Sequence, residues 1–125
     1  MATSTNDTPE WGIGGLAAQA NSAFAVGAVL VPLAALAGAL VSNNVRALTY
    51  VHVMAGVLWT GIDMFMGAVL GPVVGSLDPE QRADFFGRFT PKMTFLMPAL
   101  AIVTIAGGIT LALRLTTFAY ADQWL

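Results

Sequence analysis

The sequence predicts an all-α protein, a transmembrane helical bundle with about three spans and one short amphipathic interfacial helix. Of the 125 residues, 57% are hydrophobic and only 10% are charged, whereas soluble domains carry about 25% charged residues. The apolar residues gather in three runs, and each is close to the ~20 residues needed to cross a bilayer. Polar turns or helix-start residues separate the runs. We therefore expect spans at about 24–41, 47–70 and 93–113.

The chain begins with a polar segment, and we assign residues 1–22 to a tail and an interfacial segment ahead of a membrane domain at 23–125. The first ten residues contain no Lys or Arg. They lack the basic region of a secretory signal peptide, so we expect no cleaved signal. Segment 11–20 either lies at the interface, with Trp11 among the headgroups, or extends the first span; we favour the interface.

The first span contains no charged residue. Pro32 in its middle removes one backbone hydrogen bond and predicts a kink. Ala34 and Gly38, one turn apart, form a small-residue pair that lets another helix pack closely. The Ser-Asn-Asn cluster at 42–44 predicts a turn.

The second span, at about 47–70, follows Arg46 and contains the only histidine of the protein, His52, and one aspartate, Asp63. We expect it to end at the Gly-Pro pair at 71–72, because the residue before a proline disfavours the helical conformation.

An amphipathic helix is expected at about 79–89. Asp78 is suited to its N-cap, Pro79 to its first position and Gln81 to a capping box. One side of this helix carries aromatic residues and the other carries charges, as in helices that lie on a membrane surface. We interpret the aromatic residues as an interfacial anchor: Phe85, Phe86 and Phe89.

Pro91 should separate this helix from the third span, at about 93–113, which is expected to kink at Pro98. Its small-residue face is formed by Thr104, Gly108 and Ala112. Aromatic residues near the C-terminus, Tyr120 and Trp124, resemble a membrane-interface belt. We expect either that the chain is truncated before a fourth span or that it is a fragment of a longer protein.

The second span places its polar residues on one face. At about 100° per residue, His52, Trp59 and Asp63 fall within roughly 20° of one line, with Gly56 and Met66 about 40° to either side. A charged side chain in the bilayer costs roughly 2.5–3.5 kcal/mol on insertion scales. We therefore expect this face to turn toward protein or water.

His52 is either a metal or haem ligand, a role for which neutral imidazole is well suited, or a hydrogen-bonded polar residue near the helix end. Gly56 would leave room for a flat macrocycle, and Trp59 either contacts such a cofactor or packs between helices. Asp63 is either a proton or cation site or a buried neutral carboxyl bonded to another helix. About 16 Å along the axis separates His52 from Asp63, so the two cannot bind one ion.

Other kinds of chemistry have little support. Five methionines can be interpreted as a copper path or as packing residues, and we favour packing: Met54, Met64, Met66, Met93 and Met97. Without cysteine there is no thiolate metal site. No triad, phosphate loop or carboxylate pair appears, so we assign no catalytic residue and leave enzymatic activity open. A net charge of −2 without a basic stretch argues against nucleic acid as a partner.

About half of the chain, residues 47–113, resembles the copper-resistance-D-type superfamily of integral membrane proteins and its uncharacterised relatives. The motifs are Tyr50-Val51-His52, Leu58-Trp59-Thr60-Gly61, Gly71-Pro72, a polar loop with Arg82 and Arg88, Pro98 and Gly107-Gly108. The resemblance implies copper uptake across a membrane. Similar membrane protoporphyrinogen oxidases and a urate oxidase with a membrane domain imply haem b instead. In either case His52 would be the ligand.

The chain departs from the family pattern in three respects. Members often have Trp-x-Gly-Gly where this chain has Trp59-Thr60-Gly61-Ile62, Asp63 lies outside the pattern, and a second histidine is absent. A bis-histidine haem would therefore need a partner chain, a missing C-terminal helix or a non-histidine axial ligand.

The expected function is binding of haem b or copper through His52, for electron transfer or metal transport. The alternatives are a non-catalytic membrane subunit or scaffold in a larger complex, and a proton-coupled transporter using Asp63. We expect a multi-pass protein of the plasma membrane that forms homo-oligomers or joins other membrane subunits. An N-terminus inside the cell places three basic residues inside and two outside, which the positive-inside rule favours: Arg82, Arg88 and Lys92 against Arg46 and Arg114.

Overall fold

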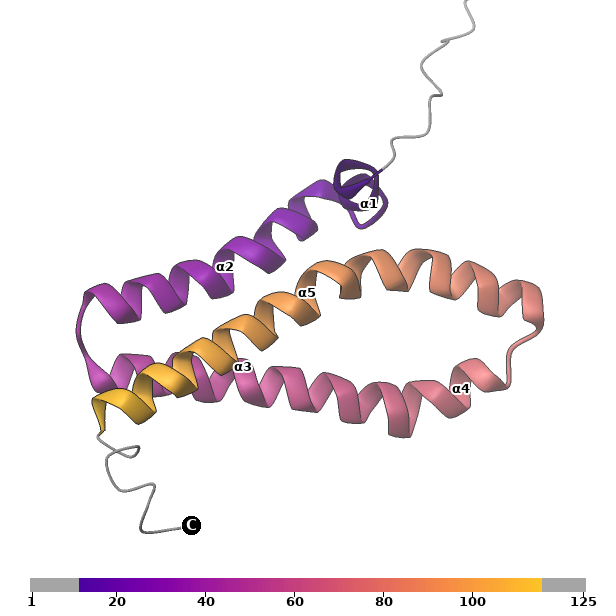
Figure 1. The fold of residues 1–125 in the computed structure, drawn as a ribbon. Coiled ribbons are helices and arrows are strands. Elements are labelled where there is room, and N and C mark those ends of the chain that lie inside the picture. The colour runs from indigo at the N-terminus through magenta and orange to yellow at the C-terminus, as the bar shows by residue number, and fades with distance from the viewer. Residues whose placement is uncertain (1–11, 116–125) are drawn as a thin grey trace, which may run out of the picture.

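The computed structural model describes residues 12–115, and within them the chain is helical apart from short turns (Figure 1). The elements are α1 (Ile13–Gln19), α2 (Ser22–Val41), α3 (Val45–Phe65), the π-helix η1 (Met66–Leu70), α4 (Gly71–Gly75) and α5 (Pro79–Arg114). α3, η1 and α4 follow one another as a continuous rod. The predicted all-α architecture with three helices able to span a membrane is confirmed. Trp11, Tyr120 and Trp124 lie outside the described residues.

The outward surface of the three long helices is apolar. Val31, Val57 and Ile102 are 69%, 61% and 54% exposed. Such extensive apolar exposure is unfavourable in water, whereas a lipid bilayer accommodates it. The small core between the helices is formed by Leu36, Ala39, Leu48, Ala55, Leu100, Val103 and Leu111.

α3 and α5 run antiparallel and approach closely in the C-terminal half of α5 (Figure 1). The ring of His52 hydrogen-bonds the backbone of Thr104, and a Cβ at Gly56 would lie 3.3 Å from the methyl group of Thr104. Both helices advance by about 1.5 Å per residue. Equal numbers of residues counted along the two helices from this contact therefore cover equal distances. This places Arg46 beside Arg114 at one end and Ala68 beside Lys92 at the other.

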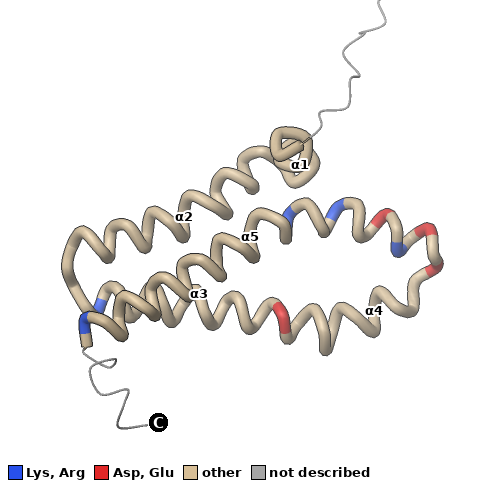
Figure 2. Tube along the Cα trace, in the orientation of Figure 1, with Lys and Arg blue, Asp and Glu red and all other residues tan. Residues whose placement is uncertain are grey.

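Basic residues mark both ends of the apolar part of the bundle (Figure 2). We call the depth of Arg114 along the bundle the Arg114 level, and the depth of Lys92 the Lys92 level. At one end, Arg114 Nη2 donates to the carbonyl oxygen of Leu40 at 3.4 Å. At the other, Lys92 Nζ donates to the carbonyl oxygen of Ala20 at 2.8 Å and lies 4.7 Å from the ring centroid of Phe24. Lys92 and Arg114 are about 22 positions apart, or about 33 Å, close to the ~30 Å of a bilayer's hydrocarbon core. A membrane therefore fits between these two levels.

The chain extends well beyond the Lys92 level as a helical hairpin, which we define as residues 69–91. Most of the charged positions in Figure 2 lie at its tip. The prediction that Pro91 separates an interfacial helix at 79–89 from the third span is wrong, because α5 continues through both Pro91 and Pro98. A proline removes only one helical hydrogen bond, and the buried Pro91 is held by packing. The capping box is confirmed: Gln81 Oε1 accepts from the backbone N–H of Asp78 at 3.2 Å.

The second span also continues past its expected end at 71–72. The N–H of Gly71 donates to the carbonyl of Met66, five residues back. This π-type turn shifts the hydrogen-bond register just before Pro72, which has no N–H to donate. The proline therefore falls in the first turn of α4, where its missing donor is tolerated.

The first predicted span matches α2, but no helix among residues 12–115 packs on its small-residue pair. Ala34 and Gly38 are both exposed, and a Cβ at Gly38 would meet no atom within 4 Å. α1 is a separate helix of seven residues and does not extend α2. Because Lys92 binds the carbonyl of Ala20, the end of α1 lies at the Lys92 level.

Candidate ligand site at His52

His52 is held in one orientation by a hydrogen bond to the neighbouring helix. Its Nδ1 lies 2.7 Å from the backbone carbonyl oxygen of Thr104. A carbonyl oxygen only accepts, so Nδ1 carries the proton, and in the neutral ring Nε2 keeps its lone pair. Metal-binding histidines usually donate their other ring N–H in this way. The ring is therefore prepared to bind a ligand through Nε2.

A glycine pair makes this arrangement possible. A Cβ at Gly108 would lie 2.8 Å from Cε1 of His52, and a Cβ at Gly107 would lie 3.2 Å from its Cβ. Any side chain at Gly108 would collide with the imidazole. Thr104 and Gly108, two of the three residues of the expected small-residue face, pack against α3.

His52 lines an open hollow of about 510 Å³ along one face of α3. The hollow is apolar and its walls are mostly small or branched residues: Val53, Gly56, Val57, Thr60, Gly61 and Met64. The methyl of Thr104 packs beside Gly56, so this glycine also serves helix approach. Within the described chain, nothing covers the hollow from outside.

The predicted polar face is only partly turned inward. Trp59 is partly buried against the core, as its interhelical packing alternative expected, and Met66 is also half-buried. Asp63 is exposed, so no helix of the described residues buries its carboxyl group. Within the described residues its carboxylate makes no hydrogen bond or ion pair. It lies five positions from Ala68, or about 8 Å inside the Lys92 level, and is not at mid-span.

The described residues contain no group of three or more His, Asp or Glu side chains that could hold a metal ion. Met64 lines the same hollow as His52, but twelve positions separate them, or about 18 Å along the axis. The two side chains cannot share one ion. Met54 is exposed, and the remaining three expected copper-path residues are half-buried: Met66, Met93 and Met97.

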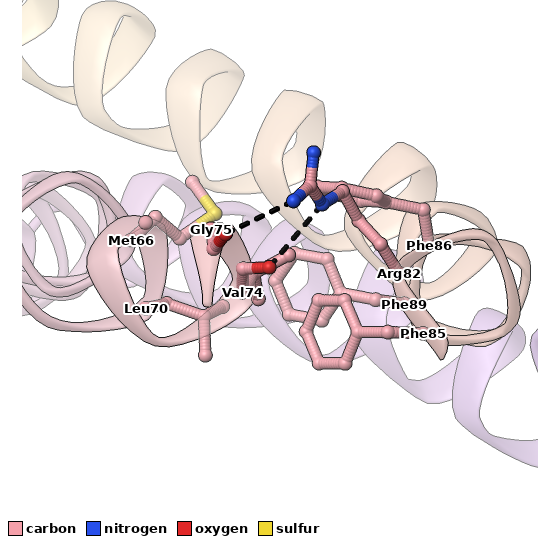
Figure 3. A pocket seen from close by; sticks show the side chains of 9 residues that line it. Met66, Leu70, Val74, Gly75, Arg82, Phe85, Phe86 and Phe89 are labelled. Carbon is pink, nitrogen blue, oxygen red and sulfur yellow. Dashed lines mark hydrogen bonds between the residues drawn. The ribbon is translucent and has the colours of Figure 1, made fainter. Parts of the chain in front are cut away.

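A second pocket, of about 260 Å³, lies in the hairpin (Figure 3). The phenylalanines interpreted as a membrane anchor line it, and the rings of Phe85 and Phe89 stack with centroids 5.1 Å apart. Across the pocket are residues of η1 and α4: Met66, Leu70, Gly71, Val74 and Gly75. Sequence reasoning missed this pocket because it ended the second span at 71–72. The stripe of Met66, Leu70 and Val74, each one turn apart, was the available signal.

Arg82 lies at the far end of this pocket. Its Nη2 donates to the carbonyl oxygens of Gly75 at 2.9 Å and Leu77 at 3.2 Å, and its Nε donates to that of Val74 at 3.3 Å. These are carbonyls at and just beyond the C-terminus of α4, which a cation stabilises.

Comparison with protein-family models, with curated proteins and with solved structures finds no match to this chain.

Proposed function

We propose that this is a multi-pass protein of the plasma membrane in which His52 binds haem b as an axial ligand, for electron transfer. One observation carries the proposal. The hydrogen bond from Nδ1 to Thr104 leaves Nε2 as the ligating atom, and the ring borders an apolar hollow of about 510 Å³. Haem, when bound, supplies the redox-active iron.

The donor set favours haem over a copper ion. A bare copper ion needs several side-chain ligands, and His52 has no second ligating side chain beside it among the described residues. Haem provides four nitrogen ligands of its own, so one imidazole is sufficient. Metal transport by copper is therefore the less favoured form of the proposal.

The hollow must be covered for haem to be retained in lipid, and the described part of the chain leaves it open. We infer that a second copy, or another membrane subunit, packs on this side of α3. The exposed Asp63 supports the same inference, since an uncompensated carboxylate below the membrane surface is unfavourable. It also favours the second candidate function, an assembly subunit without cofactor in which Asp63 meets a polar group of its partner.

The test is the absorption spectrum of the full chain, purified in mild detergent from cells supplied with haem precursor and copper. We expect a Soret band, with sharp α and β bands on reduction, and about one haem per one or two chains. His52→Ala removes the ligating atom and should abolish haem retention.

Asp63→Asn is the matched control, because it lies on the same helix and removes a charge without changing the shape. It should retain haem. If wild type binds neither haem nor copper, or if His52→Ala keeps its full cofactor content, the ligand role is refuted and the assembly-subunit function is preferred.

A further inference from the structure

The pocket in the hairpin combines an apolar interior with one cation at its outer end (Figure 3). Eight of its lining residues are apolar or glycine, and the ninth is Arg82. α5 packs mainly against α2 and α3, and much less against η1 or α4. The two arms of the hairpin therefore stand apart, and phenylalanine rings fill only part of the space between them.

The depth of the pocket matches the boundary of a membrane. Met66 lies about 3 Å inside the Lys92 level, counted from Ala68. The guanidinium of Arg82 binds the carbonyls of Val74 and Gly75, about 10 Å outside that level. A headgroup layer is about 5–8 Å thick on each side of the hydrocarbon core. The apolar end of the pocket therefore opens at the hydrocarbon core, and the cation lies just outside the headgroup layer, on its aqueous side.

Arg82 also has binding capacity left for an anion. Its Nε and Nη2 are engaged with backbone carbonyls, while its Nη1 makes no hydrogen bond within the described chain. The ion pair found among the described residues joins Arg88 to Asp84 at 3.1 Å, so no carboxylate of this part of the chain lies within ion-pair distance of Arg82. A phosphate oxygen is a favourable partner for such a guanidinium group.

We propose that this pocket binds one anionic membrane lipid, with an acyl chain among Phe85, Phe89 and Leu70 and the phosphate on Arg82. The polarity of the pocket changes from apolar to cationic in the same direction as the polarity of a lipid in its own monolayer. The lipid therefore enters sideways from the bilayer, without turning over and without leaving its leaflet. It fills the space between the arms of the hairpin and fastens the first part of α5 to α4.

The experiment is native mass spectrometry of the full chain, purified in detergent with equal amounts of phosphatidylglycerol and phosphatidylcholine that carry identical acyl chains. We expect one retained lipid per chain with about a tenfold preference for the anionic lipid, because the choline group of phosphatidylcholine neutralises the phosphate that Arg82 meets, whereas phosphatidylglycerol keeps its net negative charge. Arg82→Gln should abolish the preference.

Arg88→Gln is the matched control, because it removes the same charge from the same hairpin at an exposed residue that does not line the pocket. It should keep the preference. Since Arg82 also caps α4, a second variant leaves that cap intact. A Cβ at Gly75 meets no atom within 4 Å, so Gly75→Leu occupies pocket volume and should lower retention of both lipids.

Three results would overturn the proposal: equal retention of the two lipids by wild type, an unchanged preference in Arg82→Gln, or full retention by Gly75→Leu. Helix content by circular dichroism verifies that each variant is folded. The readout does not involve haem, so the lipid site and the role of His52 can fail independently.

Discussion

Gly108→Ala tests the packing of α3 against α5 most directly. The new Cβ would lie 2.8 Å from Cε1 of His52, whereas ordinary van der Waals separations begin at 3.4 Å. The ring or the helix must therefore shift by at least about 0.6 Å. Such overpacking costs about 1–3 kcal/mol, and the loss of the hydrogen bond to Thr104 costs about 0.5–1.5 kcal/mol. Alanine is a better helix former than glycine, which offsets up to about 1 kcal/mol of this loss of stability. We expect a net loss of about 1–2 kcal/mol in the free energy of unfolding.

Two assays measure this effect. Thermal unfolding in detergent, followed by circular dichroism, reports stability, with Gly27→Ala as the matched control because a Cβ there meets no atom within 4 Å. Because His52 is the only histidine, ¹⁵N-histidine labelling gives the ring nitrogens of a single residue. Wild type should show a protonated Nδ1, and Gly108→Ala should change its signal. The reasoning is refuted if Gly108→Ala and Gly27→Ala are equally stable and the His52 signals of Gly108→Ala match those of wild type.

Two further predictions concern the ends of the bundle. Lys92→Met removes the hydrogen bond to Ala20 and the cation–π interaction with Phe24. Amide hydrogen exchange in α1 should therefore become markedly faster, while the amides of α2 stay protected. Unchanged protection of α1 would contradict this prediction. The chain has no cysteine, so single introduced cysteines report which positions are accessible to water. In vesicles opened to both sides, Gly87→Cys in the hairpin should react with a water-soluble maleimide, and Ile102→Cys should not. Equal reaction at both positions would show that the membrane boundary is misplaced.

The spans could be predicted from the sequence because lipid imposes a simple requirement. A run such as 24–41 without charge, about as long as the bilayer is thick, has few alternatives to a transmembrane helix. The capping box at Asp78 and Gln81 was equally predictable, since it depends on residues three positions apart.

The prolines predicted the ends of helices less well. A local rule ends helices near Pro72 and Pro91, but the structure carries both helices through. At Pro72 a π-type turn shifts the hydrogen bonds, and at Pro91 tertiary packing holds the helix. Neither effect is visible in a single stretch of sequence, because each depends on hydrogen-bond register or on a neighbouring helix.

The candidate site also combines features that the sequence predicts with features that it does not predict. Helical periodicity correctly grouped His52 with Gly56 and Trp59 as residues of the inner or half-buried side. The hydrogen bond to Thr104 joins residues 52 positions apart in the chain, and no local pattern specifies such a partner. Asp63 falls on the same helical line but is exposed, since periodicity gives an angle around one helix and does not give the position of its neighbours.

The absence of a loop where the hairpin leaves the membrane has a mechanical consequence. Both arms are helices continuous with the spans, α5 on one side and the α3–η1–α4 rod on the other. A sideways force on the tip near Asp78 therefore acts on a stiff lever, about 15 Å long outside the Lys92 level and about 24 Å long from there to His52. The weakest joint of that lever is η1, where π-type turns allow a helix to bend. A molecule that binds the hairpin from the aqueous side therefore exerts torque on the crossing of α3 and α5. This crossing holds the imidazole of His52 in place.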